Sequence, residues 1–275
     1  MSDAVFLARD GRFVATELAR GPWDPTAQHG GAPAALLMRA FEQLPASDGL
    51  AIARVTYEFL RPVPLGELEV SAEVVRPGRR VQLLEASLSA HGGLEVVRAR
   101  ALQVRPADPE IRRTPVTAPA AGPDQGREND FEPQHRPMFA PDAIEVRFIE
   151  GTFRGEGPST AWFRLRGPLV AGEEPSPLQR LAAAGDFGNG ISAALPWGKY
   201  LFINPDLTLY IERPPVGDWI CLEARTIIAP DGIGMAESVL SDERGRVGRA
   251  TQALLVAPLS PGVDERARTT SGGRP

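Results

Sequence analysis

The sequence predicts an α+β protein made of two similar units, each with one long helix wrapped by an antiparallel sheet. Three observations predict this fold class. The chain has 275 residues, which exceeds one typical domain. Its two halves repeat the same order of motifs. Each half also has a single helical pattern ahead of its strand-like runs. The expectation is therefore two antiparallel sheets, each packed around its own helix.

The repeat between the halves has a spacing of 152 residues. Adding 152 superimposes Arg61 on Arg213, Pro62 on Pro214, Gly93 on Gly245 and Val104 on Val256. In both halves an Arg-Pro pair is followed by a glycine turn, two strand-like runs, a second glycine turn and a final apolar run. One fold used twice explains this agreement.

Each half has one helix candidate. Apolar residues recur at helical spacing from Gly31 to Leu44, and Pro45 ends that run. In the second half, the segment 176–179 (Ser-Pro-Leu-Gln) offers an N-cap, a proline at the first helical position and the glutamine of a capping box. The runs that follow, bounded by glycines, are typical of antiparallel strands and their turns.

Composition divides the chain further. Residues 106–143 are rich in proline and lack apolar periodicity, which predicts an extended linker. Residues 260–275 have almost no large apolar side chains, so we expect a disordered tail there. The two folded units are then expected at residues 1–105 and 144–259.

Composition also limits the classes of partner. The net charge is −5, so there is no basic field to attract a nucleic acid. Cys221 is the only cysteine, which rules out an intrachain disulfide, and no Cys and His cluster has the spacing of a structural zinc site. We expect neither a metal nor another cofactor. Arg9 and Asp10 interrupt the N-terminal stretch before a long apolar run forms, which predicts no signal peptide, no membrane partner and a cytoplasmic location.

Four short motifs occur in a fixed order along the chain. They are His29-Gly30-Gly31 at a helix start, the segment 181–187 (LAAAGDF), the segment 204–214 (NPDLTLYIERP) and the segment 250–253 (ATQA). In this order they resemble the TesB-like acyl-CoA thioesterase II family, over most of residues 10–258 apart from the linker. Members of that family are double hotdogs, a hotdog being one helix wrapped by an antiparallel sheet.

The resemblance implies a tandem (double) hotdog that hydrolyses acyl-CoA thioesters, and it leaves open a homodimer or a higher homo-oligomer. It also assigns roles to three residues of the second half. Asp186 matches the catalytic aspartate, Asn204 lies where the family supplies Thr or Asn, and Gln252 matches the glutamine that completes the site. If the family residue is Thr, Asn204 keeps hydrogen bonding but lacks the hydroxyl.

Thioester hydrolysis needs a base for the attacking water and donors for the oxyanion. Asp186 is the predicted base, and the carboxamides of Asn204 and Gln252 are expected to hold the water. Backbone N–H groups at the glycine-lined helix start are expected to bind the thioester oxygen. The predicted substrate-binding residues are therefore His29, Gly30 and Gly31.

Each of these residues also has a structural interpretation. Asp186 is also typical of a solvated or capping aspartate on an exposed helix face. Its neighbours, however, make the predicted helix apolar almost all round, so a carboxylate in the middle of it needs partners or a catalytic role. Gln252 is also typical of an outward-facing strand position, and Asn204 before proline of a turn. Subtracting 152 takes Asp186 to Ala34, Asn204 to Ile52 and Gln252 to Arg100. The polar trio is thus expected in the second half only.

Two other functions remain open at this stage. Asp24 and His29 have the spacing of the acid-base pair of MaoC-like hotdog hydratases, which would add water to an enoyl-CoA. A non-catalytic acyl-CoA or lipid binder with the same fold is the third hypothesis. Within the thioesterase hypothesis, direct attack by Asp186 through an anhydride is an alternative to general-base catalysis. The tryptophans Trp23, Trp162 and Trp197 are interpreted as core or tunnel-wall aromatics, and Cys221 as a buried, inert thiol.

Overall fold

Strands account for most of the fold. The computed structural model describes residues 3–45, 49–106, 117–128, 135–153 and 155–258. The strands of the first half are β1 (Phe6–Arg9), β2 (Arg12–Ala15), β3 (Ala51–Phe59), β4 (Gly66–Arg76), β5 (Val81–Ala90) and β6 (Leu94–Val104). Those that follow are β7 (Arg127–Glu128), β8 (Ile144–Glu150), β9 (Ser159–Leu165), β10 (Tyr200–Ile203), β11 (Asp206–Ile211), β12 (Ile220–Ile228), β13 (Ile233–Asp242) and β14 (Gly245–Pro258).

All of these strands belong to one antiparallel sheet. Its order is β1-β2-β4-β5-β6-β3-β11-β14-β13-β12-β9-β8-β7, and β10 pairs with the end of β14. The order is nearly a mirror image about the β3–β11 pair, so each strand of the first half has a counterpart in the second. Thr56 and Thr208 face each other at the centre of that pair, 152 positions apart, with their hydroxyl oxygens 3.1 Å apart.

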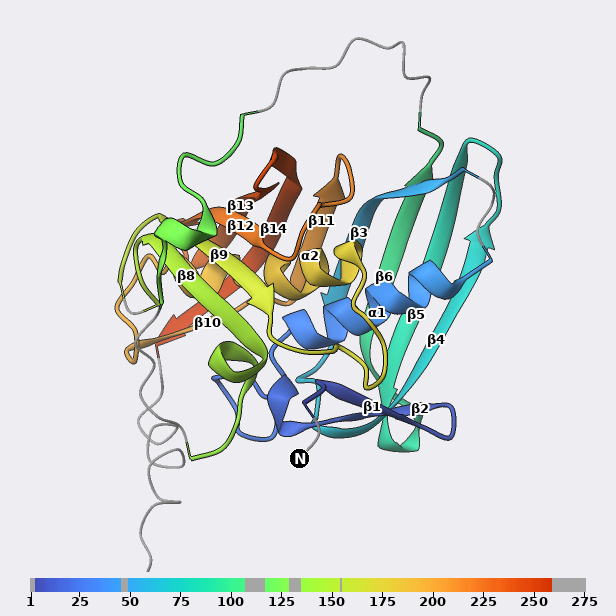
Figure 1. Ribbon diagram of the computed structural model, residues 1–275. Helices are drawn as coiled ribbons and strands as arrows, with labels where there is room; N and C mark the ends of the chain where they lie inside the picture. Colours follow the sequence, from blue (N-terminus) through green and yellow to red (C-terminus); the bar gives the residue numbers. More distant parts are fainter. Residues whose placement is uncertain (1–2, 46–48, 107–116, 129–134, 154, 259–275) are drawn as a thin grey trace, which may run out of the picture.

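The prediction of two separate sheets is wrong, because β3 and β11 pair and join the two halves into one sheet. Both strands would otherwise be edges with unpaired backbone N–H and C=O groups. Pairing from Asp206↔Glu58 to Tyr210↔Arg54 satisfies these groups without a loop between the two strands. Figure 1 shows the resulting sheet, with the helices against one face.

The helices are α1 (Gly31–Gln43), α2 (Pro177–Gly185) and the single turn α3 (Gly188–Ile191). The first agrees with the predicted run from Gly31. The second begins as predicted, since the Ser176 hydroxyl accepts a hydrogen bond from the Gln179 N–H at 3.1 Å. The Gln179 amide donates to Glu42 of α1 at 2.8 Å. With 9 residues, α2 is shorter than the long helix that was expected. These hydrogen bonds connect its first turn to α1.

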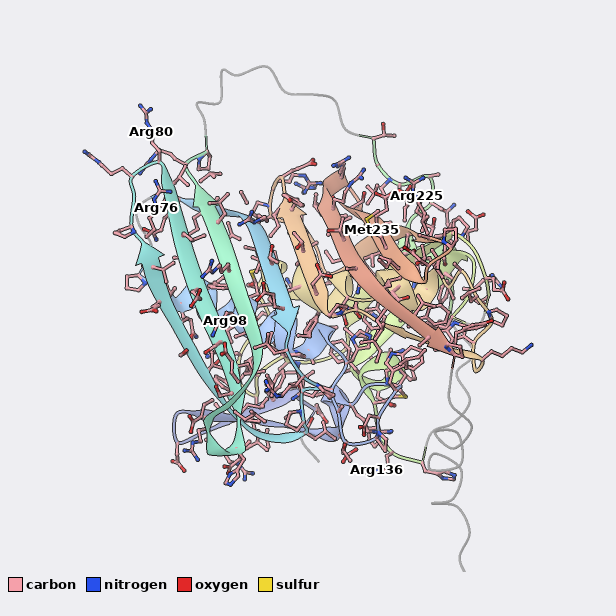
Figure 2. All side chains as sticks on the ribbon, turned by 180° about the vertical axis from the view of Figure 1, so that it is seen from behind. Arg76, Arg80, Arg98, Arg136, Arg225 and Met235 are labelled. Atoms are coloured by element: carbon pink, nitrogen blue, oxygen red, sulfur yellow. The ribbon has the colours of Figure 1, made fainter. Side chains whose placement is uncertain are left out.

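The two helices pack side by side on one face of the sheet, and Figure 2 shows the opposite face, with the strands in front of the helices. Helix α1 packs on β4, β5 and β6, and α2 packs on β9, β11 and β12. A methyl group at Gly31 would lie 2.4 Å from the carbonyl oxygen of Ala183, so only glycine permits this approach of α1 to α2. Buried side chains from both helices and both halves form one continuous hydrophobic core. This packing brings the start of α1 to the end of α2.

The described part of the predicted linker 106–143 is more ordered than its composition indicates. Arg127 and Glu128 form β7, which pairs with β8. Phe139 is fully buried in the common core, and its N–H donates to the Arg20 carbonyl at 2.9 Å. The predicted tail 260–275 lies outside the described residues. Among the described residues, no helix is long and apolar enough to cross a membrane.

Candidate active site

Asp186 lies at the end of α2, and not in the middle of a helix as the sequence predicted. It is the C-cap of α2, and Phe187 separates it from α3. The carboxylate is buried, with 5% of its side chain exposed. A buried, ionised carboxylate is costly unless hydrogen bonds compensate for the water that it loses. Asp186 therefore needs the polar partners that surround it.

Two carboxamides converge on one oxygen of Asp186. Asn204, which joins β10 to β11, donates from Nδ2 to Asp186 Oδ1 at 2.8 Å. Gln252, buried on β14, donates from Nε2 to the same oxygen at 3.0 Å. The structure thus brings together the three residues predicted as the catalytic set, from three separate elements of the second half.

The orientation of each carboxamide is fixed by a second bond. The Gln252 Oε1 atom accepts the backbone N–H of Asn189 in α3 at 3.0 Å, so Nε2 must point to Asp186. Asn204 also donates to the Asp206 carbonyl at 3.0 Å. A methyl group at Gly188 would lie 2.6 Å from Ser238 Oγ and 3.1 Å from Gln252 Oε1, so glycine at this position leaves room for both side chains.

His29 faces the other oxygen of Asp186. Its Nδ1 atom lies 3.2 Å from Asp186 Oδ2 and 3.1 Å from the backbone nitrogen of Gly31. The imidazole stacks on Phe187, with 4.3 Å between ring centroids, and packs against Phe139 at 5.1 Å. The start of α1 in the first half and the end of α2 in the second therefore form one polar cluster.

Burial opposes charge on both partners. It raises the pKa of Asp186 to about 7, although hydrogen bonds from Asn204, Gln252 and the Gly31 backbone act in the opposite direction. It also lowers the pKa of His29 to about 3, which leaves the imidazole neutral near pH 7. Because Nδ1 accepts the Gly31 N–H, a hydrogen bond across the 3.2 Å between Nδ1 and Oδ2 needs the proton on the Asp186 carboxyl, in its neutral form.

Gly30 permits this close contact. Its backbone angles are helical and accessible to any residue. A methyl group there would nevertheless lie 2.6 Å from Asp186 Oδ2 and 3.0 Å from the Phe59 ring. The Gly30 N–H has no acceptor within the described part of the chain, whereas the Gly31 N–H is directed at His29 Nδ1. Of the two predicted glycines, only Gly30 keeps an uncommitted backbone donor.

Asp24 does not pair with His29. It is exposed in the preceding loop, where one carboxylate oxygen accepts the Thr26 N–H at 2.8 Å and the Thr26 hydroxyl at 2.7 Å. The acid-base pair that the hydratase hypothesis requires is therefore not formed. His29 has a different carboxylate as its neighbour, on the second half of the chain.

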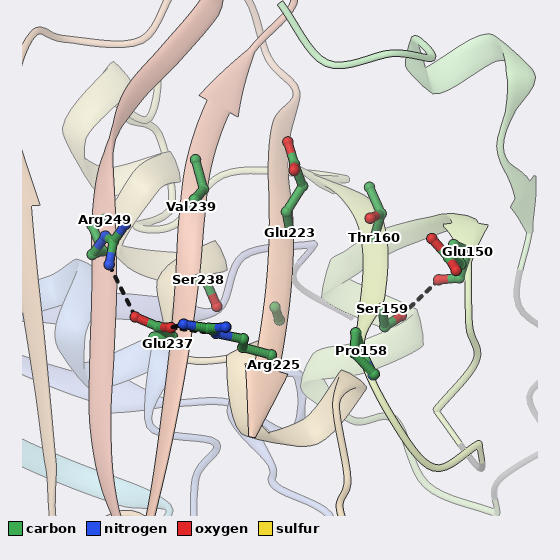
Figure 3. A pocket seen from close by; sticks show the side chains of 11 residues that line it. Glu150, Pro158, Ser159, Thr160, Glu223, Arg225, Glu237, Ser238, Val239 and Arg249 are labelled. Carbon is green, nitrogen blue, oxygen red and sulfur yellow. Dashed lines mark hydrogen bonds and ion pairs between the residues drawn. The ribbon is translucent and has the colours of Figure 1, made fainter. Parts of the chain in front are cut away.

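A hollow of about 310 Å³ lies elsewhere, over β9, β12, β13 and β14. Figure 3 shows its charged lining, in which Glu237 pairs with Arg225 and with Arg249. Neither Asp186 nor its polar partners line this hollow. Because its arginines are engaged by Glu237, the hollow provides no free cationic site, and we do not assign the chemistry to it.

Other reactive groups are scarce in the described residues. No group of three or more His, Cys, Asp and Glu side chains there is arranged to hold a metal ion. Cys221 is buried in β12, and burial raises the pKa of its thiol to about 12. A thiol with such a pKa stays protonated near neutral pH and is a poor nucleophile.

Comparison with known proteins identifies the family. A sequence model of the acyl-CoA thioesterase N-terminal domain matches residues 19–104, and one of the acyl-CoA thioesterase C-terminal domain matches residues 114–256. The chain belongs to the acyl-CoA thioesterase family. It is therefore a thioesterase, and the resemblance noted in its motifs is confirmed.

Solved structures agree on the fold of the thioesterase. A protein of unknown function with a hot dog fold from Alicyclobacillus acidocaldarius has a TM-score of 0.71 at 19% identity, covering 94% of this chain and 97% of its own. The acyl-CoA thioesterase II TesB2 from Mycobacterium marinum has a TM-score of 0.64 at 17% identity, with coverages of 92% and 94%. At such identities the likeness shows the hotdog fold alone. Among curated proteins, none matches the thioesterase at a significant level.

Proposed function

We propose that this tandem hotdog protein hydrolyses acyl-CoA thioesters to the free acid and CoA, with Asp186 as the general base. One observation supports the proposal above the others. A carboxylate with a pKa raised to about 7 is held by two carboxamides at one oxygen, which leaves its second oxygen to react. A base with a pKa near the working pH is the most effective kind.

The proposed first step is attack by water on the thioester carbonyl carbon. Asp186 Oδ2 takes the proton of the attacking water, while Oδ1 remains bonded to Asn204 and Gln252. Those two donors stabilise the carboxylate in its ionised form, as the base requires. The carbonyl oxygen becomes an oxyanion, for which the uncommitted Gly30 N–H at the start of α1 is the proposed donor.

Collapse of the tetrahedral intermediate breaks the carbon–sulfur bond. The proton held on Asp186 then passes to the departing thiolate, so the carboxyl group ends the cycle ionised. His29 remains neutral throughout and directs its Nδ1 at Asp186. Because 14% of its side chain is exposed beside the buried carboxylate, we assign His29 to the wall that the acyl thioester contacts.

A covalent route also needs an ionised Asp186 and a donor for the oxyanion, and it differs in the group that attacks the thioester. In that route Asp186 Oδ2 attacks the carbonyl carbon itself, and water then hydrolyses the resulting anhydride. A single turnover in water labelled with oxygen-18 gives part of the answer, because label in the Asp186 carboxylate indicates an anhydride opened at the Asp186 carbonyl. Label in the product acid alone is given both by the general base and by an anhydride opened at the acyl carbon. A burst of CoA released ahead of the free acid then indicates the anhydride, and equal rates of release of CoA and acid support the general base.

Release of free thiol from a panel of acyl-CoAs tests the function. The Asp186→Asn variant keeps an oxygen that can accept from Asn204 and Gln252, but it cannot take a proton. We expect it to lose at least a hundredfold in kcat, in line with the contribution of a general base. Asp231, exposed in the β12–β13 turn, provides the matched Asp231→Asn control, which should keep wild-type activity. Equal rates for both variants would contradict the proposal.

A further inference from the structure

Two tryptophans from opposite halves of the chain stack on each other. Trp23 lies in the loop that leads to His29, and Trp197 lies between α3 and β10. Their ring centroids are 5.1 Å apart and the ring planes differ by 8°. Trp23 is 39% exposed, so the stack lies at the surface. It joins a loop of the first half to a loop of the second.

Both loops lead directly into the candidate active site. The Trp23 loop is closed by a hydrogen bond from the Gly21 N–H to the Ala27 carbonyl at 2.9 Å. The His29 N–H donates to the Ala19 carbonyl at 2.9 Å, and this hydrogen bond fixes the backbone of His29. On the other side, β10 begins at Tyr200 and is followed by Asn204. Since a strand rises about 3.3 Å per residue, that strand bridges roughly 13 Å from the Trp197 loop to Asn204.

The indole nitrogen of Trp197 is buried but has no partner. Its Nε1 atom is inaccessible to solvent and donates to no acceptor among the described residues. By contrast, the Nε1 atom of Trp162 donates to the Ala121 carbonyl at 3.0 Å. A buried donor without an acceptor costs about 1–3 kcal/mol, and a buried tryptophan N–H is normally satisfied. A ligand that displaces the atoms covering Nε1 and brings an acceptor to it would remove the cost.

We propose that Trp197 Nε1 donates a hydrogen bond to an amide carbonyl of the pantetheine arm in the thiol half of the substrate, and that Trp23 holds the indole in place. The inference rests on the proposed function and specifies how that site binds its substrate. Pantetheine is an extended chain that links the thioester sulfur to a phosphate and carries two amide groups. Its carbonyls are acceptors, and it leads outward from the thioester, as do the two tryptophan loops from Asp186.

This assignment revises the interpretation of Trp23 and Trp197 as plain wall aromatics. Packing alone would be served equally by phenylalanine, which has no N–H to leave unsatisfied. The same arm occurs in CoA and in acyl carrier proteins, so the recognition is of pantetheine and not of the nucleotide. Wild-type kcat/KM on an acyl-CoA and on the matching acyl carrier protein distinguishes the two sources.

The test compares Trp197→Phe with wild type on three thioesters of one acyl group. The thiols are CoA, pantetheine and ethanethiol, the last of which has no amide. One lost hydrogen bond corresponds to about a fivefold to tenfold loss in kcat/KM. We expect kcat/KM to fall by this factor on the CoA and pantetheine thioesters, mainly because KM rises. Any fall in kcat/KM on the ethyl thioester should be smaller. Trp219→Phe, in a separate cluster with Trp162 and Cys221, is the control and should affect all three thioesters equally.

Three outcomes would overturn the inference. The first is an equal loss of kcat/KM on all three thioesters, which indicates that the tryptophan pair only holds the two loops together. The second is no loss of kcat/KM on any of them. The third is a loss on acyl-CoA without one on acyl-pantetheine, which indicates a contact with the nucleotide. If wild type hydrolyses none of the thioesters, the proposed function has failed. Calorimetric titration of CoA and of pantetheine into wild type and Trp197→Phe then still decides the binding role. Weaker binding of both ligands by the variant supports the inference, and unchanged binding overturns it.

Discussion

His29 of the first half and Asp186 of the second lie 3.2 Å apart, from imidazole Nδ1 to carboxylate Oδ2. The Asp186 side chain is buried and the His29 side chain is mostly buried, and burial disfavours the charged form of each. The pair is therefore a neutral imidazole beside a carboxyl group that titrates near neutral pH, and not an ion pair. The pH dependence of both catalysis and stability follows from this arrangement.

The first prediction concerns the acid limb of the pH profile. Because burial raises the pKa of Asp186 to about 7, kcat/KM should fall about tenfold per pH unit below that value as the base becomes protonated. The Asn204→Ala variant removes a donor that stabilises the carboxylate, so the Asp186 pKa should rise and the limb should move to higher pH. Initial rates between pH 5 and 9 measure both effects.

The control for this prediction is Asn189, a second amide of the region. The Asn189 side chain donates to the Phe202 carbonyl at 3.3 Å, and no contact of it with Asp186 occurs within the described residues. Asn189→Ala should lower activity without moving the limb. An Asn204→Ala profile with an unmoved or lower midpoint would show that Asp186 is not the titrating group.

Much of the fold was accessible from the sequence because the repeat and the helix signals are local. Pro45 and the Ser176 cap mark helix boundaries through backbone chemistry, and both agree with the structure. The joining of the halves into one sheet was not accessible. It depends on β3 and β11, which pair across 152 residues of sequence, and no local turn signal encodes such a contact.

The residues that converge on Asp186 were predicted from the sequence, but their arrangement was not, and their catalytic roles stay predictions. The 152-residue shift placed Gln252 opposite Arg100, but Thr56 pairs with Arg100 where Thr208 pairs with Thr251. The counterpart of Gln252 is therefore Ala101, one residue further along, whose side chain, unlike that of Arg100, has no polar group. Contact between His29 and Asp186 was missed because it crosses the halves. Phe139, which helps to bury His29, lies in a segment whose composition indicated only a linker.

The second prediction is that Asp186→Asn stabilises the protein at high pH. The pKa of Asp186 is about 7 in the folded state against an ordinary value of 3.8, so the folded state binds the proton more tightly than the unfolded state. Below pH 3.8 both states are protonated and no penalty exists. As pH rises towards 7 the penalty develops, and above 7 it is complete, at about 1.4 kcal/mol per pKa unit and thus a few kcal/mol in all.

Urea unfolding of wild type and Asp186→Asn at pH 5 and pH 8 measures this difference. Asparagine keeps the acceptor for Asn204 and Gln252 and carries no charge. The free energy of unfolding of the variant should therefore exceed that of wild type by more at pH 8 than at pH 5. His29 has the opposite linkage, because its lowered pKa destabilises the fold only as pH falls below its ordinary value of 6.5. It contributes to both proteins alike, so it largely cancels in the comparison. A stability difference independent of pH would contradict the assigned burial of charge.

The third prediction separates space from backbone freedom at the start of α1. Gly30 has ordinary helical angles, so an alanine there is not strained, but its methyl group would lie 2.6 Å from Asp186 Oδ2. Gly30→Ala should therefore displace the reacting oxygen and lower kcat at least tenfold, while the helix itself is retained. Gly122→Ala is the matched control, because its φ is −80° and a methyl group there meets no atom within 4 Å. Circular dichroism reports the helix and thiol release reports the site. If Gly30→Ala retained full kcat, Oδ2 would not be the oxygen that takes the proton, and the water would have to approach Asp186 from the side of Asn204.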